Sequence, residues 1–211
     1  MKKYFPVFVW WCGFVVAWSV YRSFQVDSEV LSELLVKPIL WLGSIAVAVR
    51  WRLLPVEVLK KLRIEFLRTK PMWLVFLLPF IGILGYFFAI NAKSVLFPEF
   101  SIVSLMFAVI VNFSTGLVEE VTYRGVLYVW LLSITDELSA FLLVQGMFVV
   151  AHIPTLYLNS DSLQSGLVHI FFIVLIGAVH TGVFRATKSL YASVVTHGTW
   201  NTLVHYLLVG V

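Results

Sequence analysis

Residues 101–132 read SIVSLMFAVIVNFSTGLVEEVTYRGVLYVWLL, an apolar stretch that contains Glu119, Glu120 and Arg124. One bilayer crossing needs about 20 apolar residues, so this stretch predicts either one tilted helix or a span followed by a half-helix. An ionisable side chain inside a bilayer costs about 2.5–3.5 kcal/mol on insertion scales. The three charged residues therefore need partners or a chemical role.

The rest of the chain is equally apolar. Of its 211 residues, 61% are hydrophobic and 12% are charged, whereas a soluble domain has about 45–50% and about 25%. The sequence predicts an all-α fold, a polytopic transmembrane helix bundle of about seven spans (six to eight fit the length), with its active site within the bilayer. The expected spans are 4–21, 34–50, 72–91, 101–132, 138–153, 166–184 and 189–209.

We expect residues 1–211 to form a single membrane-embedded domain. Within it, 1–100 supplies N-terminal spans without motifs, and 101–205 is the motif-bearing core. Prolines 71, 98 and 154 and the polar stretch NSDSLQSG at 159–166 are expected to separate spans.

Basic residues predict the orientation. With the N-terminus and the loop 50–70 in the cytoplasm, eleven of the fifteen lysines and arginines lie inside and Arg124 lies within a span. The three expected outside are Arg22, Lys37 and Lys93. We therefore expect an integral membrane protein with a cytoplasmic N-terminus. The short, loop-poor chain favours a prokaryotic inner or plasma membrane. The net charge of +4 arises from these flanks, so no nucleic-acid partner is expected.

The spacing of the three central charges divides them into two groups. Glu120 and Arg124 are four residues apart on a helix, with the acid nearer the N-terminus, which favours an ion pair. Glu119 points about 100° away, so it is expected to face a polar cavity. The alternative is that all three form one buried cluster that only packs helices.

Two further polar pairs lie on other expected spans. Phe148 and His152 share one helix face, and so do His197 and Asn201. At 1.5 Å per residue, Glu119, His152, His197 and Asn201 lie roughly 20, 21, 12 and 18 Å from the inner surface. These four side chains can therefore meet at one level of the bilayer. The remaining histidines, 169, 180 and 205, are interpreted as packing or interfacial residues.

In chain order these residues form the motifs EE-x3-R, followed by Gly125, then F-x3-H and H-x3-N. The series resembles that of the CPBP family, the CAAX proteases and bacteriocin-processing enzymes also called the Abi family. It is similar to that of the type II CAAX prenyl endopeptidases. The resemblance covers about residues 101–205. It implies an intramembrane endopeptidase in which Phe148 and Gly125 support the motif residues.

Peptide hydrolysis needs an activated water, a stabilised oxyanion and a proton for the leaving amine. We expect Glu119 to be the general base and then acid, with His152 assisting. His197 and Asn201 are expected to stabilise the oxyanion. In this version no cofactor is needed. In the alternative, His152 and His197 with Glu119, another glutamate or Asn201 hold a divalent metal, Zn²⁺, as in a metalloendopeptidase.

The expected partners are the lipid bilayer and a peptide or protein substrate with a membrane-proximal cleavage site. Leader peptides, bacteriocins and C-terminal sorting signals are candidate substrates. Two other functions stay open: a non-proteolytic membrane scaffold or regulator of the same fold, and a small transporter that uses the charges as a relay.

Overall fold

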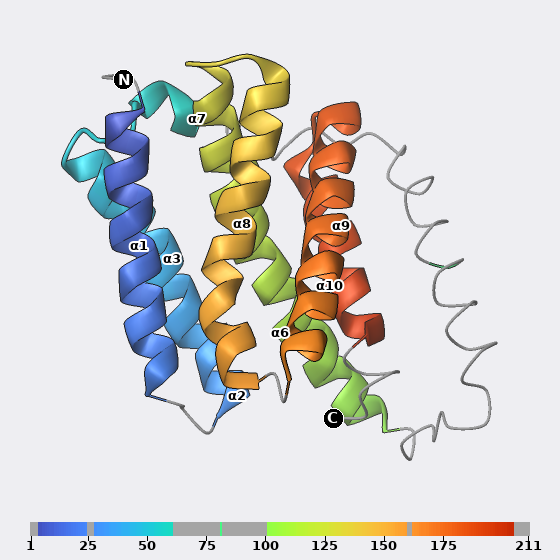
Figure 1. Cartoon of the computed structure of the whole chain (residues 1–211). Helices are drawn as coiled ribbons and strands as arrows, with labels where there is room; N and C mark the ends of the chain where they lie inside the picture. The colour runs from blue at the N-terminus through green and yellow to red at the C-terminus, as the bar shows by residue number, and fades with distance from the viewer. Residues whose placement is uncertain (1–3, 25–27, 61–80, 82–100, 160–161, 205–211) are drawn as a thin grey trace.

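The computed structural model describes residues 4–24, 28–60, 81, 101–159 and 162–204. Helix is the regular structure throughout these residues (Figure 1). The predicted all-α helix bundle is confirmed. The expected span 72–91 and His205 lie outside the described residues.

The described helices are of two kinds, α-helices and two π-helical segments that interrupt them. Their bounds are α1 Phe5–Ser23, α2 Glu29–Leu31, the π-segment η1 Ser32–Val36, α3 Lys37–Arg50, α6 Ile102–Glu120, the π-segment η2 Val121–Tyr128, α7 Val129–Leu132, α8 Glu137–Asn159, α9 Leu163–Thr187 and α10 Leu190–Thr202.

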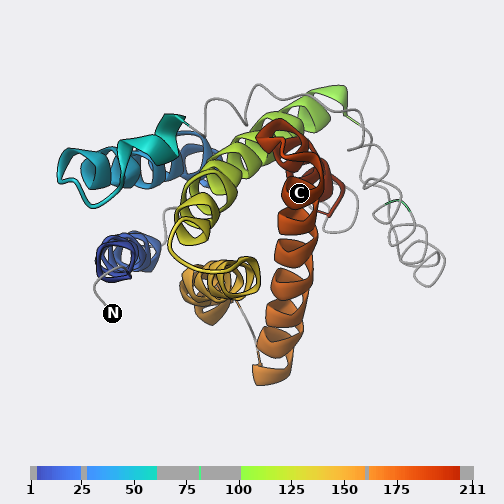
Figure 2. The same cartoon turned by 90° about the horizontal axis from the view of Figure 1, so that it is seen from above.

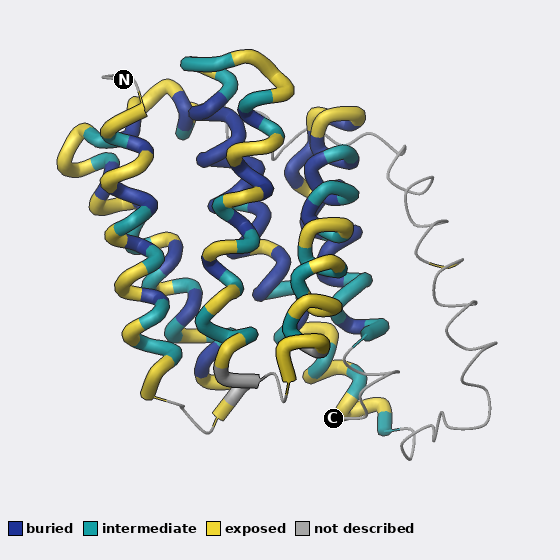
Figure 3. The backbone as a smooth tube through the Cα atoms, viewed as in Figure 1, coloured by how far each residue is buried: buried dark blue, intermediate teal, exposed yellow. Residues whose placement is uncertain are grey.

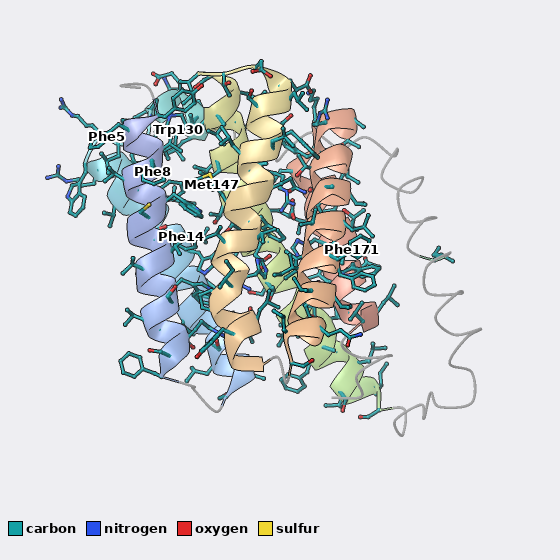
Figure 4. All side chains as sticks on the ribbon, in the orientation of Figure 1. Phe5, Phe8, Phe14, Trp130, Met147 and Phe171 are labelled. Atoms are coloured by element: carbon teal, nitrogen blue, oxygen red, sulfur yellow. The ribbon has the colours of Figure 1, made fainter. Side chains whose placement is uncertain are left out.

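Within the described residues, five helical stretches are long and apolar enough to cross a membrane: Phe5–Ser23, Ser32–Arg50, Ile102–Leu132, Glu137–Tyr157 and Gly166–Thr187. Their outer faces carry large, exposed apolar side chains. Phe8 on α1 and Phe171 on α9, labelled in Figure 4, are 60% and 63% exposed. Such a surface fits lipid rather than water. The chain is an integral membrane protein.

Two expectations about helix ends are answered by α6 and α8. The stretch 101–132 is one continuous helical run in which η2 joins α6 to α7, so it is not a span plus a separate half-helix. The expected break at Pro154 is wrong, because Pro154 lies inside α8. A proline removes one backbone donor and kinks a helix, but neighbouring helices in a membrane bundle can satisfy the group that is freed.

The run α6–η2–α7 lies at the centre of the bundle. Seen from above in Figure 2, α3 lies on one side of this run and α10 on the other, and α8 lies beside it between α1 and α9. Burial follows this arrangement in Figure 3: the buried residues concentrate on η2 and on the facing sides of its neighbours. A polar residue placed on η2 or at the end of α6 is thereby kept away from lipid.

Two glycines let α6 and α10 approach closely. A Cβ on Gly116 would lie 3.1 Å from the backbone nitrogen of Gly198, and a Cβ on Gly198 would lie 2.7 Å from the ring of Phe113. Small residues commonly allow such contact between membrane helices. The approach brings the first turns of α10 beside the end of α6, where the glutamates lie.

Local signals also fix where α10 begins. Lys188 has a φ of 52°, which turns the chain between α9 and α10. The Ser189 side chain then caps α10 by accepting a hydrogen bond from the Ala192 nitrogen at 3.2 Å. At the same end of the bundle, Asp136 caps α8 through the Ser139 nitrogen at 2.9 Å. These turns hold α8, α9 and α10 in sequence around the centre.

Candidate active site

A cavity of about 610 Å³ opens at the centre of the bundle. Its wall contains Glu119, His152, His197 and Asn201, which come from α6, α8 and α10. It also contains residues that precede position 100, from α1, η1 and α3. Those lining residues are Trp18, Arg22, Ser32, Glu33, Lys37 and Trp41. The cavity therefore joins the two halves of the chain.

Glu120 lies outside the cavity wall and is fully buried. Its Oε1 pairs with Arg124 Nη1 at 2.9 Å and accepts a hydrogen bond from His197 Nδ1 at 2.7 Å. Its Oε2 accepts a hydrogen bond from the Ser193 hydroxyl. Both oxygens are occupied, so Glu120 holds the helices together and fixes the ring of His197.

Arg124 is also fully buried, and it makes contacts beyond the ion pair. Its Nη2 donates to the carbonyl of Gly177 at 2.8 Å, and its Nε donates to Thr181 Oγ1 at 3.2 Å. Its guanidinium carbon lies 4.9 Å from the ring centre of Phe148. Arg124 thus links η2 to α8 and α9, and a cation–π contact adds to the stabilisation of its charge.

Glu119 faces the cavity and is 4% exposed. Its Oε1 accepts a hydrogen bond from Lys37 Nζ at 2.7 Å. Its Oε2 lies 3.9 Å from His152 Nε2 and 3.8 Å from His197 Nε2. The structure thus brings together three of the four expected catalytic side chains, with one carboxylate oxygen held and the other turned towards the histidines.

Lys37 is the site residue that the sequence interpretation missed. Expected as an outer charge, it lies instead within the candidate span Ser32–Arg50 and is 5% exposed. Its Nζ also pairs with Glu33 Oε2 at 2.8 Å, and Thr115 Oγ1 donates to the same oxygen at 2.7 Å. A buried ammonium between two carboxylates is an electrostatic element of the site rather than a marker of topology.

The hydrogen bonds assign the ring nitrogens of both histidines. His152 Nδ1 lies 2.7 Å from the Phe148 carbonyl oxygen, and His197 Nδ1 faces the Glu120 carboxylate. Both oxygens only accept, so each Nδ1 carries the hydrogen. In the neutral ring the Nε2 lone pair is then directed towards the cavity. Phe148 packs against His152 with ring centres 4.4 Å apart and helps to fix that orientation.

A water can bridge the His152 Nε2 lone pair and the Glu119 carboxylate. A hydrogen bond spans about 2.5–3.2 Å, so the 3.9 Å between His152 Nε2 and Glu119 Oε2 leaves room for one water that donates to both. A divalent metal would use these two atoms together with His197 Nε2, and the Nδ1 hydrogen bonds resemble those of metal-bound histidines. The Lys37 ammonium, however, already contacts that carboxylate and repels a second cation. The residues therefore fit water better than a metal.

Another group of possible ligands is formed by Glu120, His180 and His197, whose ligand atoms lie within 4.8 Å of one another. It is a poor metal site, because Arg124 and Ser193 already occupy the Glu120 oxygens. The His180 ring stacks on His197 at 4.4 Å with an angle of 12° between the planes, so the two rings do not converge on one point. His180 packs against the site residue His197.

The other expected residues have simpler positions. Gly125 is buried within η2, next to Arg124. His169 is on the exposed face of α9, as expected for an interfacial residue. Asn201 lies four residues beyond His197 on α10 and lines the same cavity. Asn112 and Thr115 also line this cavity.

Comparison with known proteins extends the geometry. No curated protein and no solved structure matched the chain. The sequence model of the family described as type II CAAX prenyl endopeptidase Rce1-like matches residues 101–203. The matched segment contains every motif residue from Glu119 to Asn201. It begins at residue 101, so Glu33 and Lys37 lie outside it. Residues 101–203, slightly less than half of the chain, are therefore similar to the Rce1-like type II CAAX prenyl endopeptidases.

Proposed function

We propose that this chain hydrolyses a peptide bond at the membrane, with Glu119 as the general base and then the general acid. The observation that carries the proposal is the position of Glu119 Oε2. It lies 3.9 Å from His152 Nε2 and 3.8 Å from His197 Nε2 on the wall of the central cavity. A carboxylate with one oxygen held and the other aimed at two rings suits activation of a water.

The proposed reaction has two proton transfers. Glu119 removes a proton from the water that His152 helps to hold, and the oxygen of that water attacks the substrate carbonyl carbon. The carbonyl π electrons move to its oxygen, which becomes the oxyanion of the tetrahedral intermediate. When the C–N bond breaks, Glu119 returns the proton to the leaving nitrogen. The immediate products are a carboxylic acid and an amine, and Glu119 is regenerated as a carboxylate. Transfer of the remaining acid proton to the amine gives a carboxylate and an ammonium.

His197 and Asn201 are proposed to donate to the oxyanion. Asn201 can donate through its amide. His197 Nδ1 already donates to Glu120, so His197 needs a second hydrogen, on Nε2, to donate into the cavity. A charge-assisted donor of this kind binds an oxyanion strongly.

The metal-free version is the one that Lys37 supports. The ammonium 2.7 Å from Glu119 takes the position of counter-charge to this carboxylate that a divalent metal would otherwise supply. In the alternative, His152, His197 and Glu119 hold Zn²⁺, which would polarise the water. Metal content of the purified protein decides between them. Stoichiometric zinc that is lost in His152→Ala would support the alternative.

The substrate is proposed to be a peptide or protein cleaved next to the bilayer. The proposed location is a prokaryotic inner or plasma membrane with the N-terminus in the cytoplasm. With Lys37 assigned to the site, the outer flanks lose one of their expected positive charges, which strengthens the predicted asymmetry. No nucleic-acid partner and no bound cofactor are proposed.

The test compares protein termini in membranes from cells that express the wild-type chain or Glu119→Gln. Peptide termini that appear only with the wild type identify substrates. A purified assay in proteoliposomes then uses the peptides so found, together with a fluorogenic farnesylated CAAX peptide. Glu137→Gln, at an exposed glutamate remote from the cavity, is the matched control and should retain wild-type activity.

Loss of cleavage in Glu119→Gln with an unchanged thermal midpoint is the expected result. Full biological function in Glu119→Gln and His197→Ala would instead leave the non-proteolytic scaffold as the better reading. Ion or solute flux into proteoliposomes that disappears with the same substitutions would favour a transporter.

A further inference from the structure

Lys37 occupies an unusual position, because it comes from the half of the chain outside the matched family segment. Its Nζ lies 2.7 Å from Glu119 Oε1 and 2.8 Å from Glu33 Oε2. The sequence separation between Lys37 and Glu119 is 82 residues. Lys37 therefore links the N-terminal half of the chain directly to the proposed base.

The surroundings of Lys37 fix its ammonium in place. Glu33 holds it from one side, and Glu33 itself accepts a hydrogen bond from Thr115 on α6. The ring centres of Trp41 and Trp18 lie 5.2 and 5.8 Å from Nζ. Two aromatic faces and two carboxylates leave the side chain little freedom. A fixed ammonium can in turn hold the Glu119 carboxylate, to which it is hydrogen-bonded, in one orientation.

The two oxygens of Glu119 show what that position does. The ammonium binds Oε1, so the plane of the carboxylate is set and Oε2 is directed between the two histidines. Without the ammonium, the carboxylate is free to rotate or to turn towards His197. A purely structural ion pair would need no such relation between the second oxygen and the site.

We propose that Lys37 is a positioning residue for the proposed base: it holds Glu119 so that one carboxylate oxygen faces the water site, with Glu33 and Thr115 holding Lys37 in turn. The inference rests on the proposed function. It also assigns a role in the active site to residues before position 100, which carry no motif.

The experiment separates position from folding by removing charges in pairs. Lys37→Met alone keeps the volume but leaves two buried carboxylates without their cation, and can fail to fold. Lys37→Met combined with Glu33→Gln removes one positive and one negative charge, so the summed charge of the cluster is unchanged. Glu33→Gln alone keeps Lys37 beside Glu119. Arg185→Gln, at an exposed ion pair, is the control for handling.

Rates are measured in proteoliposomes on a peptide found by the terminal comparison. We expect the double variant to keep a wild-type thermal midpoint, to lose kcat by on the order of 100-fold and to change KM less than about threefold, since small misplacements of a catalytic group have effects of that size. Glu33→Gln is expected to lose less than about tenfold. Lys37→Arg, which keeps the cation, should recover part of the lost kcat.

A double variant with wild-type kcat would overturn the proposal. A fall in kcat that accompanies a clear fall in thermal midpoint, and that Lys37→Arg does not recover, would also overturn it. A structure of the double variant gives a readout that needs no activity. We expect the Glu119 carboxylate to leave the histidine face, and an unchanged carboxylate would also overturn the proposal. If Glu119→Gln is fully active, the proposed function fails, whereas the carboxylate position in the double variant still decides the role of Lys37.

Discussion

Glu119 and Glu120 are neighbours in sequence and both pair with a buried cation, yet only Glu119 lines the cavity. Glu120 is fully buried, and Arg124, His197 and Ser193 occupy its oxygens. Glu119 lines the cavity, with Lys37 on one oxygen and two ring nitrogens near the other. A helix turns by about 100° per residue, which separates the two environments. The comparison shows that position on the helix, rather than residue type, divides a structural acid from a candidate catalytic one.

The same substitution at the two glutamates is expected to have different results, and the largest effect is expected on the cleavage rate of the Glu119 variant. Glu119→Gln should lower the rate of peptide cleavage by about 10²–10⁴-fold, the range that general acid–base groups contribute. The thermal midpoint should stay close to that of the wild type, because Lys37 keeps its ion pair with Glu33. Glu120→Gln should mainly lower the thermal midpoint, because it leaves Arg124 buried without its partner. Peptide hydrolysis in proteoliposomes and thermal unfolding in detergent measure the two effects.

A similar fall in stability for both variants would mean that the two glutamates are one structural cluster. That outcome would return Glu119 to the packing role that its sequence neighbourhood alone allows.

The second-largest effect is expected on stability, from loss of the ion pair between Glu120 and Arg124. Arg124→Ala should destabilise the protein by about 3–5 kcal/mol, because it strands the Glu120 carboxylate in the interior. It also removes the donors to Gly177 and Thr181 that join η2 to α9. Thermal or denaturant unfolding in detergent measures the loss. An unfolding midpoint equal to that of Glu119→Gln would argue against the division between the two acids.

A smaller effect is expected from a substitution at Gly198, which lies next to His197 on α10. Gly198→Ala places a Cβ 2.7 Å from the Phe113 ring, so either that ring or α10 has to shift. Overpacking of this kind costs about 1–3 kcal/mol. Because His197 precedes Gly198, kcat should fall as well. Reduced cleavage with a modest drop in thermal midpoint is expected, and a relaxed variant such as Phe113→Leu combined with Gly198→Ala should restore part of both.

The smallest effect comes from a pair that resembles neither acid. Arg185 Nε lies 2.8 Å from Glu137 Oε1, but the side chains are 41% and 53% exposed. Exposed ion pairs contribute about 0–1 kcal/mol. Arg185→Gln should therefore leave both cleavage and unfolding nearly unchanged. A loss as large as that of Arg124→Ala would show that this link between α8 and α9 matters more than its exposure suggests.

The sequence predicts the helical fold well because the bilayer leaves a chain few options. Every backbone group must be satisfied within the segment, so long apolar runs become helices. The limits of 101–132 followed from that rule. Pro154 did not, because a proline weakens a helix locally and the surrounding helices decide whether it continues.

The candidate site is predictable only where its residues repeat along a helix. The pair Glu120 and Arg124 and the pair Phe148 and His152 are visible as four-residue spacings. No such spacing identifies Lys37, because its partner Glu119 lies 82 residues away. A single lysine near the end of a span is instead interpreted as a topology signal. The stacking of His180 on His197 is hidden for the same reason: it depends on how α9 packs against α10.

The two π-helical segments have a consequence for comparing this chain with relatives. Both adjoin the charged site: η1 contains Glu33 and ends next to Lys37, and η2 begins directly after Glu120 and contains Arg124. A π-turn closes i→i+5 hydrogen bonds, one residue more than an α-turn. A relative whose helix is regular here will align only with a gap inside an unbroken helix. Closing that gap by deleting one residue would rotate every later side chain of the run by about 100°.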